Sequence, residues 1–205
     1  VGGKRTPVTF TRGKEHDYLG MTLDFKTKGV VRINMTEYVQ KRILEELPNG
    51  FVGGSATTPA ADHLFTVTES SPRLSKLRGE EFHTVVAKLL FLCKRARPDM
   101  QTSVAFLCTR VRDPTEEDQL KLERAIKYLR ATKEMVLTLR ADNLNVVKWW
   151  VDAAFAVHPD MRSHTGGTMS LGVASVYSSS KKQKLNTKSF SGLLRRFVLR
   201  ASPFT

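Results

Sequence analysis

The spacing of apolar residues changes twice along the chain, and this restricts the fold more than any other feature of the sequence. Apolar and polar residues alternate in residues 19–35, which is the period of a half-buried strand. Between residues 80 and 132 the apolar residues recur every three or four positions, as in amphipathic helices. Alternation returns from residue 136 onward. The sequence therefore predicts an α/β protein of the α+β type, with helices placed between two groups of strands.

The first alternating segment predicts a β-hairpin followed by a helix. Its two strands are Leu19–Phe25 and Val31–Met35, separated by a short turn. The hydroxyl of Thr36 is expected to cap the helix that follows. We expect residues 1–16 to be a loose lead-in. Residues 50–79 are rich in Gly, Ser, Thr and Pro, and are expected to form a long surface connection.

Three amphipathic helices are predicted in the middle of the chain. The first begins at Glu80 and ends before Pro98, because the residue that precedes a proline disfavours the α conformation. The second is short and contains Val104–Val111. The third begins at Asp113, which is expected to act as its cap. Together these segments predict a group of packed helices.

Two strands, Val136–Leu139 and Val146–Val151, are predicted after the helices. The second is strongly apolar and leads into Asp152. A carboxylate at that place is either exposed at the strand end or held by a metal ion. Two further alternating segments, rich in Ser, Thr and Val, complete a predicted antiparallel sheet. The apolar residues of the tail, residues 190–205, are compatible with a helix.

The charge of the chain indicates a polyanionic partner. Its 205 residues include 33 Lys and Arg but 20 Asp and Glu, a formal net charge of +13. Such a surface attracts nucleic acid, and an anionic membrane is the second choice. No purely basic amphipathic helix supports a membrane surface, and no apolar run is long enough to span a bilayer, so no membrane partner is expected. With no visible signal peptide and two cysteines in apolar helical patterns, we predict an intracellular protein, cytoplasmic or nuclear and not secreted.

Cations gather near the C-terminus of the chain. Lys181, Lys182 and Lys184 fall within four positions, Arg162 precedes them, and no Asp or Glu follows Asp160. A solvated charge run is the ordinary explanation for such a cluster. The one-sided charge over the last 45 residues favours contacts to phosphates instead. Such contacts would position a duplex without reading its base sequence.

A zinc site is an alternative use of the same region. His158 and His164 lie close together in the sequence, with Asp152 and Asp160 nearby. A closed zinc site takes four ligands, usually with Cys among them, and no Cys is near. We therefore expect both histidines to lie on the surface. No motif supports a Cys or Ser nucleophile.

Eight short motifs occur in a definite order along the chain. They are Tyr18–Met21, Tyr38, Thr58–Pro59, Arg97–Asp99, Tyr128–Thr132, Trp150–Ala156, Arg162–Gly167 and Ser180–Gln183. In this order they resemble the reverse transcriptase and ribonuclease H region of Ty1/copia-type retrotransposon Pol polyproteins. Each motif alone is modest, but the collinear set is specific. The resemblance extends from about His16 to Ser189.

The resemblance implies a division of the chain into four segments. Residues 1–60 would be the end of the reverse-transcriptase palm, and residues 61–143 the helical thumb-like region. Residues 144–189 would be a truncated ribonuclease H-like domain, followed by a divergent tail, residues 190–205.

The resemblance also implies nucleic-acid contacts in the first two segments. Tyr18 and Gly20 of the hairpin would belong to an element like the primer grip, which holds the primer's 3′ end. Lys88 and Arg95 would lie on the basic side of a helix that follows the minor groove of the template–primer duplex.

Catalysis in ribonuclease H of this family needs two Mg²⁺ ions held by four carboxylates. Asp152 matches the first of these. Where the family has its second, a Glu, this sequence has Phe190–Arg196 without an acidic residue. The polymerase aspartates of the family are also absent from the sequence. The chain is therefore expected to bind RNA–DNA hybrid or template–primer duplex, to be catalytically inactive alone and to hold no Mg²⁺.

Two other functions stay open. The chain could be a ribonuclease H-type nuclease whose missing carboxylates come in trans from another polypeptide or a second copy. It could also be a non-enzymatic basic module that binds nucleic acid. The sequence does not fix its oligomeric state.

Overall fold

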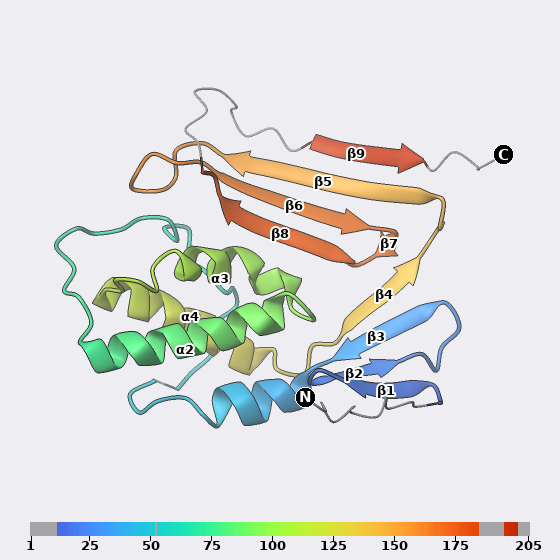
Figure 1. Cartoon of the computed structure of the whole chain (residues 1–205), viewed down its shortest axis with the longest axis horizontal. Coiled ribbons are helices and arrows are strands. Elements are labelled where there is room, and N and C mark those ends of the chain that lie inside the picture. Colours follow the sequence, from blue (N-terminus) through green and yellow to red (C-terminus); the bar gives the residue numbers. More distant parts are fainter. Residues whose placement is uncertain (1–11, 52, 185–194, 201–205) are drawn as a thin grey trace, which may run out of the picture.

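The computed structural model describes residues 12–51, 53–184 and 195–200, with the backbone alone in the last range. Two antiparallel sheets and a group of helices make up the described part of the chain (Figure 1). The predicted α+β class is confirmed. The helices lie between the hairpin at the start of the chain and the second sheet (Figure 1).

The first sheet joins the N-terminal hairpin to a strand that follows the helices. Its order is β1-β2-β3-β4-β7, with β1 Glu15–Tyr18, β2 Met21–Asp24, β3 Val30–Asn34, β4 Leu137–Ala141 and β7 Gly172–Val173. The hairpin of β2 and β3 is confirmed. The loose lead-in is wrong for its last residues, because β1 begins at Glu15 and pairs with β2. β4 is placed beside β3 by pairs such as Val31 with Leu139.

This pairing bears on how the chain is divided. β4 lies within residues 61–143 but completes the sheet of residues 1–60. The four predicted segments stay a prediction.

The second sheet has the order β8-β6-β5-β9. Its strands are β5 Val146–Ala154, β6 His164–Ser170, β8 Tyr177–Lys182 and β9 Arg195–Arg200. The helix expected in the tail is wrong for residues 195–200, which pair with β5 along its free edge. An open strand edge presents unpaired backbone N–H and C=O groups, and pairing with β9 satisfies those of β5. Residues 190–194, where the sequence departs from the family pattern, lie outside the described part.

The three amphipathic helices are confirmed, with different ends. They are α2 Lys76–Cys93, α3 Gln101–Cys108 and α4 Glu116–Ala131, and a 3₁₀ turn, η2 Pro98–Met100, precedes α3. The cap of α4 is Thr115 and not Asp113. The Thr115 hydroxyl accepts a hydrogen bond from the Asp118 N–H, and the Asp118 carboxylate accepts one from the Thr115 N–H. This capping box fixes the start of α4 two residues later than predicted.

The helix after the hairpin is short and changes type. It starts as α1 Thr36–Tyr38 and continues as a π-helix, η1 Val39–Leu44. Thr36 does not cap it through its hydroxyl. Instead, the Thr36 N–H donates to Asn34 Oδ1 over 2.8 Å, so the side chain before the helix supplies the acceptor.

The hydrophobic core is built by the helices. Phe82, Leu89, Phe106 and Leu129 are among its fully buried side chains. Among the described side chains of β5, β6 and β8, none belongs to this core. The buried side chains of the second sheet and of the β5–β6 connection are polar instead: His158, Ser163, His164, Ser170 and Ser180. By contrast, Met21, Ile33 and Leu137 of the first sheet pack against the core, so the two sheets are held to the helices by different chemistry.

Two further observations concern cysteines and membranes. Cys93 is buried, Cys108 is half-buried, and both are free thiols. Burial raises the pKa of both thiols. No helix in the described ranges is both long and apolar enough to cross a lipid bilayer.

Candidate nucleic-acid interface

The residues predicted to contact nucleic acid form two groups in the structure. The first lies around Tyr38 and consists of Tyr18, Gly20, Lys88 and Arg95. The second lies at one end of the second sheet and consists of Arg162, Lys181, Lys182 and Lys184.

Tyr38 connects the turn between β1 and β2 to α2. Gly20 follows β1 with φ of +74°, and a Cβ there would lie 3.6 Å from Tyr38 Cδ2. The Tyr38 ring centroid is 5.1 Å from that of Phe91, and the Arg95 guanidinium carbon lies 3.5 Å from the Phe91 centroid. A continuous series of contacts therefore runs from the turn at Gly20 to Arg95 near the end of α2.

Lys88 takes part in this group as a structural contact. Its Nζ lies 2.7 Å from Glu46 Oε2, and its backbone carbonyl accepts a hydrogen bond from the Tyr38 hydroxyl. The Lys88 ammonium and the Arg42 guanidinium lower the pKa of Glu46 through hydrogen bonds. Lys88 thus already has an anionic partner, whereas Tyr18, the last residue of β1, is 59% exposed.

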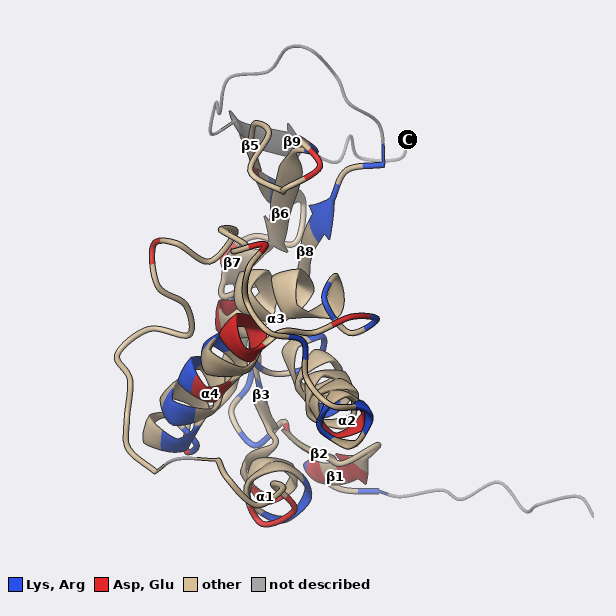
Figure 2. Ribbon diagram, turned by 90° about the vertical axis from the view of Figure 1, so that its left-hand side faces the viewer, with Lys and Arg blue, Asp and Glu red and all other residues tan. Residues whose placement is uncertain are grey.

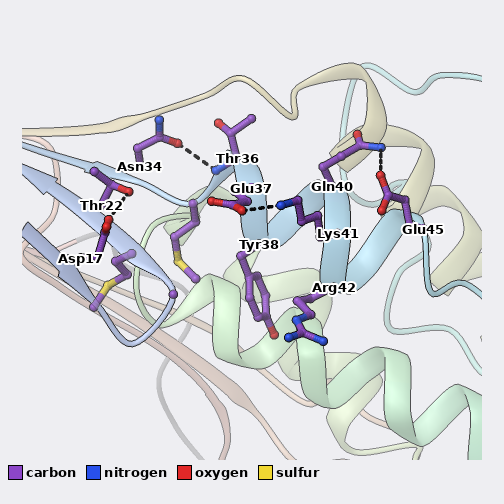
Figure 3. A pocket seen from close by; sticks show the side chains of 13 residues that line it. Asp17, Thr22, Asn34, Thr36, Glu37, Tyr38, Gln40, Lys41, Arg42 and Glu45 are labelled. Carbon is purple, nitrogen blue, oxygen red and sulfur yellow. Dashed lines mark hydrogen bonds and ion pairs between the residues drawn. The ribbon is translucent and has the colours of Figure 1, made fainter.

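A groove of about 900 Å³ lies between this hairpin and the helix of α1 and η1 (Figure 3). Its charged side chains already have hydrogen-bond or ion-pair partners. Lys41 donates to Glu37 over 2.7 Å, and Thr22 donates to Asp17 over 2.8 Å. Carboxylates and cations both line it, so the groove presents no excess of positive charge to a phosphate.

The second group has more cations than its nearby carboxylate can pair. Asp160 Oδ2 lies 2.8 Å from Lys182 Nζ and 3.3 Å from Arg162 Nε. Desolvation opposes ionisation of Asp160, but the hydrogen bond and charge of Lys182 prevail and lower its pKa. Lys181 and Lys184 are exposed, and no ion pair to either occurs within the described ranges. Figure 2 shows the end of β8 in blue, away from the helices.

Asp152 lies in β5 and is exposed. It stands opposite Gly166 of β6, which in turn stands opposite Ser180 of β8. Its Oδ1 accepts a hydrogen bond from the Ala153 N–H over 2.8 Å. A Cβ at Gly166 would meet only the backbone oxygen of Asp152, at 4.0 Å, so there is room beside Asp152 at this point of the sheet.

The donor set around Asp152 does not fit a two-Mg²⁺ centre. Such a centre relies on several carboxylates that bridge or flank the ions. In the part of the chain that the structure describes, no group of three or more His, Cys, Asp or Glu side chains is arranged to hold a metal ion.

The histidines are buried, so the expectation of surface positions is wrong. His158 is 2% exposed and His164 5%. His158 Nε2 lies 3.0 Å from His164 Nδ1, and His164 Nε2 lies 2.6 Å from the Ser180 hydroxyl. The β5–β6 connection folds back on itself through a hydrogen bond from the His158 N–H to the Arg162 carbonyl. This fold of the connection places the His158 side chain in the protein interior, beside Phe65 and Phe106.

Aromatic side chains and α3 complete the surroundings of the histidines. The Phe65 ring centroid lies 5.2 Å from His158 and 5.0 Å from His164. β8 is bound to α3 by the Ser178 hydroxyl, which donates to Gln101 Oε1 over 3.0 Å. Alternation along β6 places His164 and Gly166 on one face of the sheet. The sequence pattern around these residues gives no sign that this face packs against α3, so the burial of His164 could not be predicted from it.

Two of the family-like motifs meet in space. Arg97 is 2% exposed, and its guanidinium binds the Asp99 carboxylate. It also donates to the backbone carbonyl and the hydroxyl of Thr132, and the Tyr128 hydroxyl donates to Asp99. The motifs 97–99 and 128–132 therefore join the end of α2 to the end of α4. Their role in this structure is to hold the helices together.

The comparisons with known proteins give one relative. "Putative transposon Ty5-1 protein YCL074W" of Saccharomyces cerevisiae is 28% identical to this chain over 173 residues, which are 84% of the chain and 55% of the relative. The chain is transposon-derived. It spans about half the length of the curated relative it matches. No protein-family model matches the chain. No solved structure matches it either.

Proposed function

We propose that this transposon-derived chain is part of a copia-type reverse transcriptase and ribonuclease H polyprotein. In this proposal it binds RNA–DNA hybrid or template–primer duplex and does not cleave it alone. The collinear motifs and the similarity to a transposon protein support the origin. The binding is supported by the charge of the chain and by the distribution of its cations.

The observation that carries the proposal is the cationic end of β8. Asp160 holds Arg162 and Lys182 close together, while Lys181 and Lys184 stay exposed. Such cations bind phosphates and release the counterions that surround a duplex. We infer that this end of the sheet lies along the phosphate backbone. Because phosphates are the same in every sequence, binding would not depend on base sequence.

A matched pair of variants tests this proposal. Lys181→Gln with Lys184→Gln removes two exposed cations from the end of β8. Lys28→Gln with Lys76→Gln removes two exposed cations from elsewhere. Fluorescence anisotropy with an RNA–DNA hybrid at fixed salt should show roughly tenfold weaker binding for the first variant. The control should bind within about twofold of wild type. Equal loss in both variants, or no binding by the wild type, would contradict the proposal.

The exposure of Asp152 favours one alternative, a nuclease completed in trans. Under this alternative, another chain would bring carboxylates to the open space beside Gly166. The isolated chain is expected not to cleave a labelled hybrid in Mg²⁺. If an added polypeptide produces cleavage that Asp152→Asn abolishes, the alternative holds. The other alternative, a non-enzymatic basic module that binds nucleic acid, would bind duplex DNA, duplex RNA and hybrid with equal affinity.

A further inference from the structure

A small cavity lies at the other end of β8, away from the cationic end. It has a volume of about 200 Å³ and is lined by residues from the end of α2 and from β3, β4 and the start of β8. Figure 1 shows where these elements lie in the fold. Its apolar lining includes Ile33, Leu137 and Leu139. We call it the α2–β8 cavity. Ligand pockets for whole small molecules are larger than this, so the cavity has room for a single ring system.

Two adjacent cations, Lys94 and Arg95, line the same cavity. Their side chains are bound to backbone carbonyls: Lys94 Nζ donates to Ser178 over 3.4 Å, and Arg95 Nη1 donates to Phe91 over 3.1 Å. Neither has an ion pair with a carboxylate among the described residues, in contrast to Lys88. A guanidinium has five N–H donors, so Arg95 keeps donors for an anion.

An aromatic side chain completes the lining. Tyr177 is 47% exposed, and its ring centroid lies 6.0 Å from that of Trp149. A half-exposed ring held by a second aromatic group is a platform on which a nucleobase stacks. The cavity thus combines an aromatic surface, an apolar floor and two unpaired positive charges, which is the combination that one nucleotide needs.

We propose that the α2–β8 cavity binds one unpaired nucleotide of a single-stranded segment. The base lies against Tyr177 and the apolar floor, and its phosphate lies on Lys94 and Arg95. This inference rests on the proposed function and extends it, because the cationic residues Lys181 and Lys182 lie at the opposite end of β8 from Tyr177. The six residues of β8 separate the two ends by roughly 17 Å. A duplex at one end would continue into a single strand that reaches the other.

The test compares three substrates with the whole chain by fluorescence anisotropy. The first is a blunt RNA–DNA hybrid. The second is the same hybrid with a single-stranded overhang on one strand, and the third has abasic sites throughout that overhang. The overhang should tighten binding about tenfold, from the stacking of one base. The abasic overhang should lose this gain. Overhang and blunt substrates of equal affinity would overturn the inference and leave the proposed function intact.

Substitutions test whether the increase in affinity from the overhang comes from the α2–β8 cavity. Tyr177→Leu keeps an apolar side chain but removes the ring, and should abolish the overhang gain without changing affinity for the blunt hybrid. Lys94→Gln should reduce the gain. Phe25→Leu, which alters a 43% exposed ring on the hairpin, is the control and should keep it. Thermal unfolding should show that all three variants are folded. A full overhang gain in Tyr177→Leu would overturn the inference.

A further result would support binding of a single strand at the cavity and contradict the proposed binding of a duplex. A single-stranded oligonucleotide alone should bind, and Tyr177→Leu should weaken that binding about tenfold. If this result appears while the wild type fails to bind the blunt hybrid, the inference holds and the proposed duplex binding fails. If neither substrate binds, both are wrong.

Discussion

His158 Nε2 lies 3.0 Å from His164 Nδ1, and both rings are buried between the second sheet and the helices. One of these two nitrogens donates an N–H and the other accepts it, so the two imidazoles cannot both be protonated in this arrangement. Burial, with a smaller contribution from the charge of a protonated His158, lowers the pKa of His164 to about 4. Burial and the charge of Lys182 lower the pKa of His158, against the opposing effect of Asp160.

Acid should therefore weaken this junction. The unfolded chain takes up a proton on His164 near pH 6.5, but the folded chain does so only near pH 4. The contribution to stability is complete above pH 6.5 and is lost as the pH falls from 6.5 to 4, by roughly 3 kcal/mol. Urea unfolding at pH 7.5, 6 and 5 measures it. His83→Gln, at an exposed position in α2, should keep this pH profile. A free energy of unfolding that stays constant from pH 7.5 to 5 would refute the prediction.

Even a conservative substitution of the buried Arg97 should destabilise the fold. Lysine keeps the charge but cannot bind the Asp99 carboxylate and Thr132 at the same time. Arg97→Lys is expected to lower the free energy of unfolding by about 2 kcal/mol, since it leaves buried acceptors unsatisfied. Arg112→Lys, at an exposed position, should change it by less than about 0.5 kcal/mol. If Arg97→Lys lowers the free energy of unfolding no more than Arg112→Lys does, the Arg97 contacts do not stabilise the fold.

Two leucines of α2 provide a matched test of the core. Leu89 is 0% exposed and Leu77 is 66% exposed. Leu89→Ala removes buried methyl groups and leaves a cavity, so it should cost about 2–5 kcal/mol. Leu77→Ala should cost less than about 0.5 kcal/mol. Chemical denaturation of both variants decides between a helix packed as described and one that is rotated, in which the two costs would be reversed.

The second sheet should open before the helices do. Its strands β5, β6 and β8 add no described side chain to the hydrophobic core, and the buried groups at its junction are polar. Amide hydrogen exchange should therefore be faster in β5, β6 and β8 than in α2, α3 and α4. Equal protection in both regions would mean that they unfold as one unit.

Local patterns in the sequence predicted much of this fold. The hairpin of β2 and β3 and the helices α2 to α4 follow from the period of apolar residues, because that period depends on near neighbours. The start of α4 was misplaced because Asp113 and Thr115 are both good caps. Asp118, three residues after Thr115, decides between them.

Long-range contacts could not be predicted in this way. The pairing of β4 with β3, and of β9 with β5, depends on which strand edges meet after the chain has folded. The same holds for His158 and His164, since a polar residue is buried only when distant residues such as Ser180 supply its hydrogen bonds. For the candidate interface, the sequence indicated the cations of β8. It did not indicate that Lys88 is paired with Glu46.

The salt dependence of binding tests the central claim most directly. The logarithm of the affinity for an RNA–DNA hybrid should fall linearly with the logarithm of salt concentration, because bound phosphates release counterions. Lys181→Gln with Lys184→Gln should reduce the slope by about 2, one for each lost phosphate contact. The Lys28→Gln with Lys76→Gln control should keep the wild-type slope. A wild-type affinity that does not depend on salt, or the same slope in all three proteins, would contradict phosphate binding at the end of β8.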